Sequence, residues 1–230
     1  MNVHYVSLRN GVENWEERRE SVSCLLADLG PDIAVFQEME TFGGRDKSAE
    51  NLQLSWLQDQ LPQYQFAAVG DPDTYPSTQP IMYRPDIFEA LEQGFFFFSP
   101  QPDDIYSRPW KGGYPSFCSW VLFRFIPTDK SFYVYNVHLD FSSPSTRVSS
   151  SRLIVERISS RRNPDAPVLL LGDFNSFRTF KTIKILTDAD LSVSLNRKST
   201  FHFNIGMNLI PAIDHVLVSD ELLLYSAEVV

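Results

Sequence analysis

Residues 168–175 read Val-Leu-Leu-Leu-Gly-Asp-Phe-Asn, four apolar side chains followed by a glycine and then by Asp173 and Asn175. An apolar run that turns polar at its end is typical of a buried strand that surfaces at that point. The segments 33–38, 132–138 and 213–218 also join apolar residues to carboxylates, amides or a histidine. These are the groups that a divalent cation and a phosphate ester require.

Helix and strand patterns alternate around these segments. The first helix, 15–29, is ended by Gly30 and Pro31, as a glycine after the last turn and a following proline should do. The other expected helices are 48–61, 152–158 and 180–186, and the other expected strands are 1–8, 32–37, 80–83, 91–98, 117–126 and 131–139. The four consecutive phenylalanines 95–98 are expected to fill an interface between sheets. Two mixed sheets flanked by helices is the architecture that accommodates this order.

Composition restricts the class of protein. A chain of 230 residues with 43% hydrophobic residues fits one domain, and its formal charge of −9 disfavours long contacts with a nucleic-acid backbone. The basic residues Arg157, Arg161 and Arg162 are interpreted as surface residues at a helix end. Cys24 and Cys118 are expected to be buried free thiols. Without a signal or membrane-spanning pattern the expected location is cytoplasmic, although a removed signal peptide would leave no trace.

Six motifs occur in the order seen in the endonuclease/exonuclease/phosphatase superfamily, which the sequence resembles over nearly its whole length. The motifs are Gln37-Glu38, residues 80–84 (Pro-Ile-Met-Tyr-Arg), 136–140 (Asn-Val-His-Leu-Asp), 171–176 (Leu-Gly-Asp-Phe-Asn-Ser), 200–202 (Thr-Phe-His) and 213–215 (Ile-Asp-His). Residues 15–19 and the segment around Trp110 look like a bacterial branch that acts on small phosphoesters. The resemblance implies a single α/β domain over 1–230, a four-layer sandwich of two mixed β-sheets packed face to face with flanking helices.

The resemblance also implies a metal ion and a set of catalytic residues. Glu38 would bind Mg²⁺ or Mn²⁺, a role for which a hard carboxylate oxygen is suited. Asp173 would activate the attacking water, Asn175 would donate its amide to a phosphoryl oxygen, and His138 would bind the charge that develops there. Asp214 would orient a histidine supplied from further along the chain. The residues expected to support the site or to contact the substrate are Ser7, Gln37, Asn136, Asp140, Trp110 and His202.

Each of these residues also has a purely structural interpretation. Glu38 alone would be a surface carboxylate, and a lone histidine on a strand is usually a core or surface residue. Asp173 and Asn175 could bond their own backbone in an Asx-turn. The two residues are two apart and share one side of an extended segment, which favours a common target. His215 is given no catalytic role.

The sequence departs from the superfamily pattern at several positions. Ser7 aligns where relatives have an asparagine, Ser77 lies where an acid would pair with His138, and Lys111 and Ser116 replace an acid and an arginine. The closing strand and its Ser-Asp-His motif, expected beyond Asp214, do not occur before the end of the chain. Either the natural protein has a further C-terminal tail, or the protein binds its ligand without turnover. The second alternative arises because the loss of one catalytic residue from such a group lowers the rate by several powers of ten.

The expected activity is metal-dependent hydrolysis of a phosphomonoester or phosphodiester by an activated water. One alternative is a binding module for a phosphorylated ligand on the same fold. A second is a β-sandwich that binds carbohydrate or protein, suggested by the aromatic content of 13%. A small phosphoester or a lipid headgroup suits the acidic chain better than duplex DNA. No heptad pattern indicates an oligomer.

Overall fold

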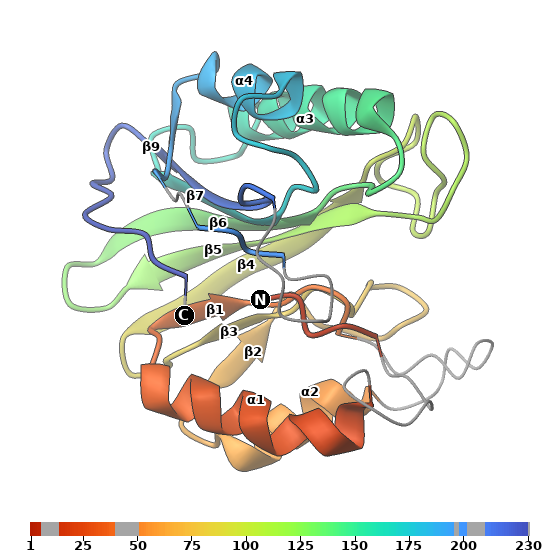
Figure 1. Ribbon diagram of the computed structural model, residues 1–230. Coiled ribbons are helices and arrows are strands. Elements are labelled where there is room, and N and C mark those ends of the chain that lie inside the picture. Colours follow the sequence, from red (N-terminus) through yellow and green to blue (C-terminus); the bar gives the residue numbers. More distant parts are fainter. Residues whose placement is uncertain (6–13, 40–50, 196–197, 202–209, 230) are drawn as a thin grey trace.

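The computed structural model describes residues 1–5, 14–39, 51–195, 198–201 and 210–229. Two sheets lie face to face between two pairs of helices (Figure 1). The small sheet has the strand order β1-β3-β2, and the large sheet has the order β4-β5-β6-β7-β9-β8. Helices α1 and α2 cover the outer face of the small sheet, and α3 and α4 cover that of the large sheet. The predicted four-layer α/β sandwich is confirmed. The large sheet is mixed as expected, whereas the strand pairs of the small sheet are both antiparallel.

The elements have the following bounds. The helices are α1 Trp15–Leu29, α2 Leu52–Gln60, α3 Pro144–Ser159 and α4 Lys181–Thr187. The small sheet contains β1 Ile33–Val35, β2 Gln65–Ala67 and β3 Ile81–Tyr83. The large sheet contains β4 Phe88–Phe97, β5 Phe117–Phe125, β6 Lys130–His138, β7 Val168–Asp173, β8 Leu191–Val193 and β9 Asp214–Ser219.

Strand register in the large sheet places three predicted site residues in one row. Strands β6 and β7 are parallel and pair His138 with Asp173, and the antiparallel pair β7 and β9 sets Asp173 opposite Asp214. Because paired residues of neighbouring strands lie about 5 Å apart, the row brings an imidazole and two carboxylates together. The crossover between the parallel strands runs through α3 on the outer face of the sheet (Figure 1).

The hydrophobic core fills three spaces between the layers. Side chains from both sheets, including Ile81, Phe123 and Val134, form the cluster between the sheets. A second cluster joins α3 and α4 to the large sheet, and a third joins α1 and α2 to the small sheet. Within the run 95–98, Phe96, Phe97 and Phe98 are buried, so these rings belong to the core as expected. The expected position between the sheets was wrong for Phe96 and Phe98, which pack in the cluster between the large sheet and helices α3 and α4. Burial of this apolar surface holds the two sheets at a fixed separation.

The helices begin and end where side chains satisfy free backbone groups. The Asn14 side chain accepts a hydrogen bond from the Glu16 amide at 3.0 Å, and Gly30 ends α1 in the left-handed region at φ 53°. Helix α3 is longer than the predicted 152–158, because Ser143 caps it and Pro144 occupies its first position. The serine-rich first half stays helical, with hydroxyls such as that of Ser150 bonded back to a carbonyl four residues earlier.

Some expectations differ from the structure. The strand expected at 1–8 is represented in the described residues only by a single bridge between Asn2 and Gln37. Strands β2 and β8 were not predicted, since three residues are too few for a periodic signal. The prediction that Cys24 is buried was wrong: α1 buries the side that carries Val22 and Leu26, and Cys24 is exposed. Cys118 is buried as expected.

The basic residues after α3 interact with the backbone and with acidic side chains. Arg161 donates to the Ile158 carbonyl at 2.7 Å and so satisfies an acceptor at the end of α3. Arg157 pairs with Asp103, and Arg162 pairs with Glu92. This agrees with the interpretation of these arginines as surface residues at a helix end. No helix within the described ranges is long and apolar enough to cross a membrane.

Replacing Gly172 by alanine should destabilise the fold by about 2 to 4 kcal/mol. Gly172 has φ 138°, and an added Cβ would lie 2.1 Å from the Val137 carbonyl oxygen on the neighbouring strand, so backbone atoms would have to move. Urea unfolding measures the loss. Gly112→Ala is the matched control, because Gly112 also has a positive φ, of 74°, but open space around its Cβ position. Equal losses in the two variants would contradict the role of close strand packing.

Candidate active site

The predicted site residues converge where the ends of β1, β6 and β7 meet. His138 Nε2 lies 3.8 Å from Glu38 Oε1 and 3.8 Å from Asp173 Oδ2. Glu38 follows the small sheet, whereas His138 and Asp173 end strands of the large sheet. The imidazole therefore lies between carboxylates that belong to different sheets. With side-chain exposures of 20%, 15% and 8% for His138, Glu38 and Asp173, the group is largely shielded but still reaches solvent.

Glu38 is held by two residues that the sequence interpretation missed. It has φ 58°, an unusual backbone conformation for a glutamate, which turns the chain directly after β1. Asn2 Nδ2 donates to Glu38 Oε1 at 2.9 Å, and His4 Nδ1 lies 3.1 Å from Glu38 Oε2. The sequence contained a signal for these two residues, because the tripeptide Asn-Val-His occurs at 2–4 and again at 136–138, where it includes the predicted site residue His138. Ser7, aligned where relatives have an asparagine, lies outside the described residues, and the amide that contacts Glu38 is that of Asn2.

Asp173 and Asn175 combine the Asx-turn with a position beside His138. The Asn175 amide N–H donates to Asp173 Oδ1 at 2.8 Å, which is the Asx-turn geometry. Asp173 Oδ2 is the oxygen near His138. The Asn175 side-chain amide donates to the Leu139 carbonyl at 2.8 Å, so one of its two N–H groups is engaged by the loop after β6. The turn therefore fixes Asp173 and leaves its second oxygen directed at the site.

Burial and neighbouring charge raise the pKa of two aspartates. The pKa of Asp173 rises to about 6, first because the carboxyl is buried; hydrogen bonds from Asn175 and Asn2 oppose the shift, and Glu38 adds to it. The pKa of Asp214 also rises to about 6, through burial and then through repulsion by Asp173. Such values lie near those of efficient general bases at neutral pH. Burial lowers the pKa of His138, against the attraction of Glu38 and other carboxylates.

Asp214 lies on β9 beside Thr200, whose side chain is hydrogen-bonded to the backbone at the start of β9. The Thr200 hydroxyl oxygen accepts hydrogen bonds from the backbone N–H groups of Ile213 and Asp214 at 3.0 and 3.1 Å. The next residue, His215, is buried, and its Nε2–H donates to the Ser176 carbonyl at 2.8 Å. This is a structural contact, in line with the absence of a catalytic assignment for His215. His202 lies outside the described residues.

Gln37 and Asn136 form a buried link between the sheets. Gln37 Nε2 donates to Asn136 Oδ1 at 2.6 Å, and Asn136 Nδ2 donates to the Phe36 carbonyl at 2.8 Å. Both side chains are 0% exposed, so neither can touch a substrate. Their geometry instead ties the end of β1 to the end of β6, where Glu38 and His138 follow. Hydrogen bonds buried in this way favour one relative position of the sheets, because a shift would break both of them.

Asp140 and Trp110 lie in the loops that follow β6 and β4, respectively. Asp140 Oδ1 accepts from the Ser142 and Ser143 amides at 2.8 and 2.6 Å, which forms the turn before α3. Trp110 is 40% exposed in the loop between β4 and β5.

A divalent cation of the magnesium type fits the donor groups. In the described part of the chain no three His, Cys, Asp or Glu side chains gather as a complete metal cage. Mg²⁺ does not need one, since it is commonly held by one or two carboxylates while it keeps several waters. Glu38 offers such a carboxylate, and its repulsion of Asp173 adds to the burial that raises the pKa of that carboxyl. A cation at Glu38 would offset that repulsion.

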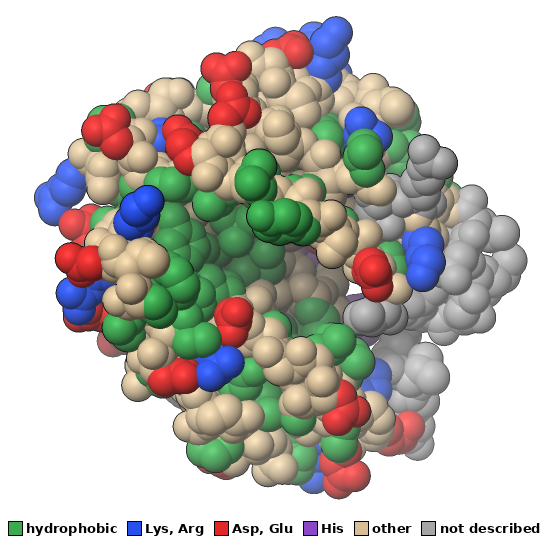
Figure 2. Space-filling model, turned by 90° about the vertical axis from the view of Figure 1, so that its left-hand side faces the viewer, with side chains coloured by type: hydrophobic (Ala, Val, Ile, Leu, Met, Phe, Trp, Pro, Cys, Tyr) green, Lys and Arg blue, Asp and Glu red, His purple; other side chains and the backbone are tan. Residues whose placement is uncertain are grey.

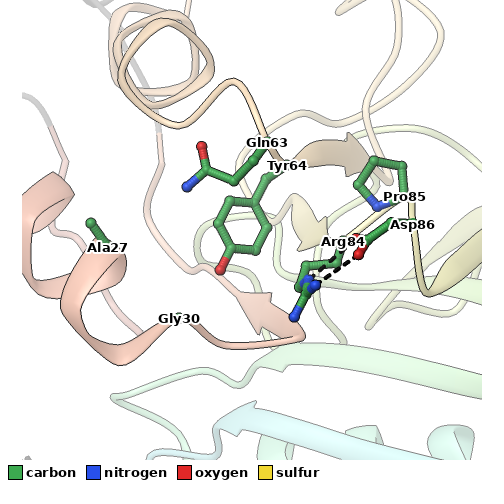
Figure 3. A pocket seen from close by; sticks show the side chains of 7 residues that line it. All are labelled: Ala27, Gly30, Gln63, Tyr64, Arg84, Pro85 and Asp86. Atoms are coloured by element: carbon green, nitrogen blue, oxygen red, sulfur yellow. Dashed lines mark hydrogen bonds and ion pairs between the residues drawn. The ribbon is translucent and has the colours of Figure 1, made fainter.

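The face of the molecule at which β1 begins, on the left in Figure 1, is hollowed, and in the space-filling view of this face hydrophobic side chains line the hollow (Figure 2). A pocket near the start of β1, at the opposite end of that strand from Glu38, is lined by Tyr64 and Arg84 (Figure 3). Arg84 is engaged there by Asp86 and Asp32, so it does not offer a free charge for a phosphate.

Replacing Asp214 by asparagine should stabilise the metal-free protein at neutral pH by roughly 2 to 3 kcal/mol. A carboxyl whose pKa is raised from 3.8 to about 6 by folding weakens the fold as pH rises through that interval, and the full cost is present above pH 6. Asparagine removes that cost while its carbonyl can still accept from Thr200. Urea unfolding in EDTA at pH 7.5 and pH 4 measures the gain, which should vanish at the lower pH. Asp220→Asn, at an exposed carboxylate after β9, is the control. A gain independent of pH would contradict the explanation.

Two facing sheets that bring carboxylates, amides and a histidine to one shared edge define a class of enzymes, the phosphoester hydrolases of the α/β sandwich type. Comparison with known families agrees, because the model described as "Endonuclease/Exonuclease/phosphatase family" matches residues 2–230. The chain belongs to this family, whose members hydrolyse phosphoester bonds and generally use divalent metals.

Individual relatives are similar over most of their length. The mannosyl-6-phosphatase Bt3783 of Bacteroides thetaiotaomicron VPI-5482 is 26% identical, with a TM-score of 0.78 over 95% of this chain and 83% of that chain. An endonuclease/exonuclease/phosphatase family protein from Bacteroides thetaiotaomicron is 26% identical, with a TM-score of 0.79 over 95% of this chain and 81% of that chain. "Uncharacterized protein L388" of Acanthamoeba polyphaga mimivirus is 28% identical over 204 residues, which are 86% of this chain and 73% of that protein.

Proposed function

We propose that this chain hydrolyses a small phosphomonoester with the help of a divalent cation held at Glu38. The observation that carries the proposal is the convergence of Glu38, His138 and Asp173, in which one imidazole nitrogen lies 3.8 Å from a carboxylate of each sheet. The name of the mannosyl-6-phosphatase relative supports a phosphomonoester. The formal charge of −9 supports a small substrate over a polynucleotide.

The cation, when bound, supplies charge that neutralises phosphoryl oxygens. Asp173 Oδ2 accepts the proton of the attacking water, for which a pKa of about 6 is suitable. His138 stays neutral because burial lowers its pKa, and its N–H donates to a phosphoryl oxygen as charge develops there. The water oxygen bonds to phosphorus, the bond to the alcohol oxygen breaks, and that oxygen takes a proton from solvent.

The other polar residues position these groups. Asn2 and His4 hold the two oxygens of Glu38, and Asn175 holds Asp173 through its backbone N–H. A fixed geometry matters because a misplacement of about 1 Å can cost two orders of magnitude in rate. Asp214 lies beside Asp173, and the charge of Asp173 adds to the burial that raises the pKa of Asp214. Gln37 and Asn136 act at a distance, through the relative position of the two sheets.

Phosphate release from a panel of phosphomonoesters and diesters tests the proposal. Release should require Mg²⁺ or Mn²⁺, should stop in EDTA, and should return when the metal is restored. Monoesters should be preferred to bis(p-nitrophenyl) phosphate, a diester. If calorimetry instead detects tight binding of phosphorylated ligands but no ester is hydrolysed, the chain is a binding module and the proposal fails.

A further inference from the structure

Two exposed aromatic rings lie beside the candidate active site. Phe141 is 75% exposed and follows His138 by three residues, and Tyr114 is 86% exposed in the loop between β4 and β5. The segments that carry them are neighbours, since a Cβ built on Gly113 would lie 3.7 Å from Asp140 Oδ2. Neither ring packs against another aromatic ring of the described residues. Both rings are therefore available to a ligand that enters from this side.

The backbone that carries Phe141 is fixed to the site. The Leu139 N–H donates to the Asp173 carbonyl at 2.9 Å, and the Leu139 carbonyl accepts from the Asn175 side chain at 2.8 Å. Arg147, only 7% exposed, donates through Nη1 to the carbonyls of Asp140 and Phe141 at 2.8 and 3.0 Å. A buried arginine thus holds the backbone of an exposed phenylalanine. Because this backbone is already fixed, an aromatic contact made from it costs little conformational entropy when a ligand binds.

The two carboxylate oxygens of Asp140 differ in their hydrogen bonding. Oδ1 accepts from the Ser142 N–H, the Ser142 hydroxyl and the Ser143 N–H, at 2.8, 2.9 and 2.6 Å. Oδ2 accepts no hydrogen bond from the described residues and is the oxygen near Gly113. A carboxylate only accepts hydrogen bonds, so the free oxygen suits a ligand rich in hydroxyl groups. The missing side chain at Gly113 leaves room for that ligand.

We propose that Phe141, Tyr114 and Asp140 form the subsite for the leaving group of the substrate, and that this group is a sugar ring. The aromatic faces contact the C–H face of the sugar, and Asp140 Oδ2 accepts hydrogen bonds from its hydroxyls. The assignment rests on the proposed function, because the sugar phosphate must place its phosphorus beside Asp173 and Glu38. A polynucleotide is the poorer occupant of a chain with a formal charge of −9, and Arg147 beside this subsite is buried and bound to carbonyls.

The test compares two phosphomonoesters that differ in the ring, mannose 6-phosphate and glycerol 3-phosphate. The wild type should hydrolyse the sugar phosphate with a kcat/KM at least about tenfold higher, and Phe141→Ala and Tyr114→Ala should each lower that ratio about tenfold. Asp140→Asn should also lower the ratio, while its carbonyl preserves the turn before α3. Ile126→Ala is the control, because Ile126 is 46% exposed at the opposite end of β6 and should leave the ratio unchanged.

The outcomes separate this inference from the proposed function. If neither ester is hydrolysed, the proposed function fails. If both are hydrolysed but the wild type shows no preference, or prefers adenosine 5′-monophosphate, or if the aromatic variants lower both rates by one factor, the sugar assignment is overturned. Phe141→Leu, which keeps an apolar side chain, guards against loss of folding and should still lower the ratio. Calorimetry with the Asp173→Asn protein provides a readout without turnover: Phe141→Ala should weaken its binding of mannose 6-phosphate about tenfold.

Discussion

Replacing Asp173 by asparagine is expected to lower kcat for phosphomonoester hydrolysis by about a thousandfold or more, because the change removes the proton acceptor for the attacking water. The fold should survive the change. The Asn175 N–H bonds to Asp173 Oδ1 at 2.8 Å, and an asparagine carbonyl can accept the same bond. Removing a buried charge whose pKa folding raises to about 6 should also stabilise the metal-free protein at neutral pH. Lower activity is therefore expected together with equal or higher stability.

Steady-state kinetics with mannose 6-phosphate and urea unfolding of the same preparations measure both parts of this prediction. Asp165→Asn is the matched control, since it removes the charge of an exposed aspartate in the turn before β7 and should leave kcat within about twofold. A loss in kcat of less than tenfold for Asp173→Asn would mean that another group accepts the proton. A large loss accompanied by unfolding would assign Asp173 a structural role.

Replacing Glu38 by glutamine is expected to remove the stabilisation that Mg²⁺ gives and to lower activity by at least about a hundredfold. A ligand that binds only the folded protein stabilises it in proportion to the logarithm of its concentration over Kd, by about 2.7 kcal/mol at a hundredfold excess over Kd. The neutral glutamine is a poor ligand for this hard cation. Its carbonyl can accept from Asn2, and its NH2 group can donate to His4 Nδ1 when that imidazole carries its proton on Nε2, so the metal-free variant should be at least as stable as the wild type.

Thermal unfolding in EDTA and over a series of Mg²⁺ concentrations measures this effect. The melting temperature of the wild type should rise with Mg²⁺, and that of Glu38→Gln should not. Glu156→Gln, at an exposed glutamate on α3, is the matched control and should respond like the wild type. If the melting temperature of Glu38→Gln still rises with Mg²⁺ as in the wild type, the cation binds at other residues.

Local patterns predicted the strands that carry the site. The apolar run 168–171 and its polar end predicted β7 and the position of Asp173, because a buried strand needs apolar side chains on both faces. The same reasoning predicted β6 with His138 at its end. It missed the beginning of α3 at Pro144, since the serines that follow read as a loop and become helical only through bonds to earlier carbonyls.

The partners of Glu38 could not be predicted with the same method. Asn2 and His4 lie 36 and 34 residues from Glu38 in sequence, and their contact depends on how the first residues cross the end of β1. Likewise, Gln37 was expected either to support the site or to contact the substrate, and the meeting of the two sheets excludes the contact by burying it against Asn136. Such contacts join distant segments, and only the packing of the layers decides them.

The sequence by itself determined which runs become buried strands, where each turns polar, and to which family the chain belongs, because these depend on the order of residue types along the chain. Only the tertiary structure decided that His138 lies between Glu38 and Asp173, that Asn2 and His4 hold Glu38, and that exposed rings lie beside the site. Strand register and the fit between two sheets set those distances. Both are non-local, since a shift of one residue in pairing would turn the same side chains to the opposite face.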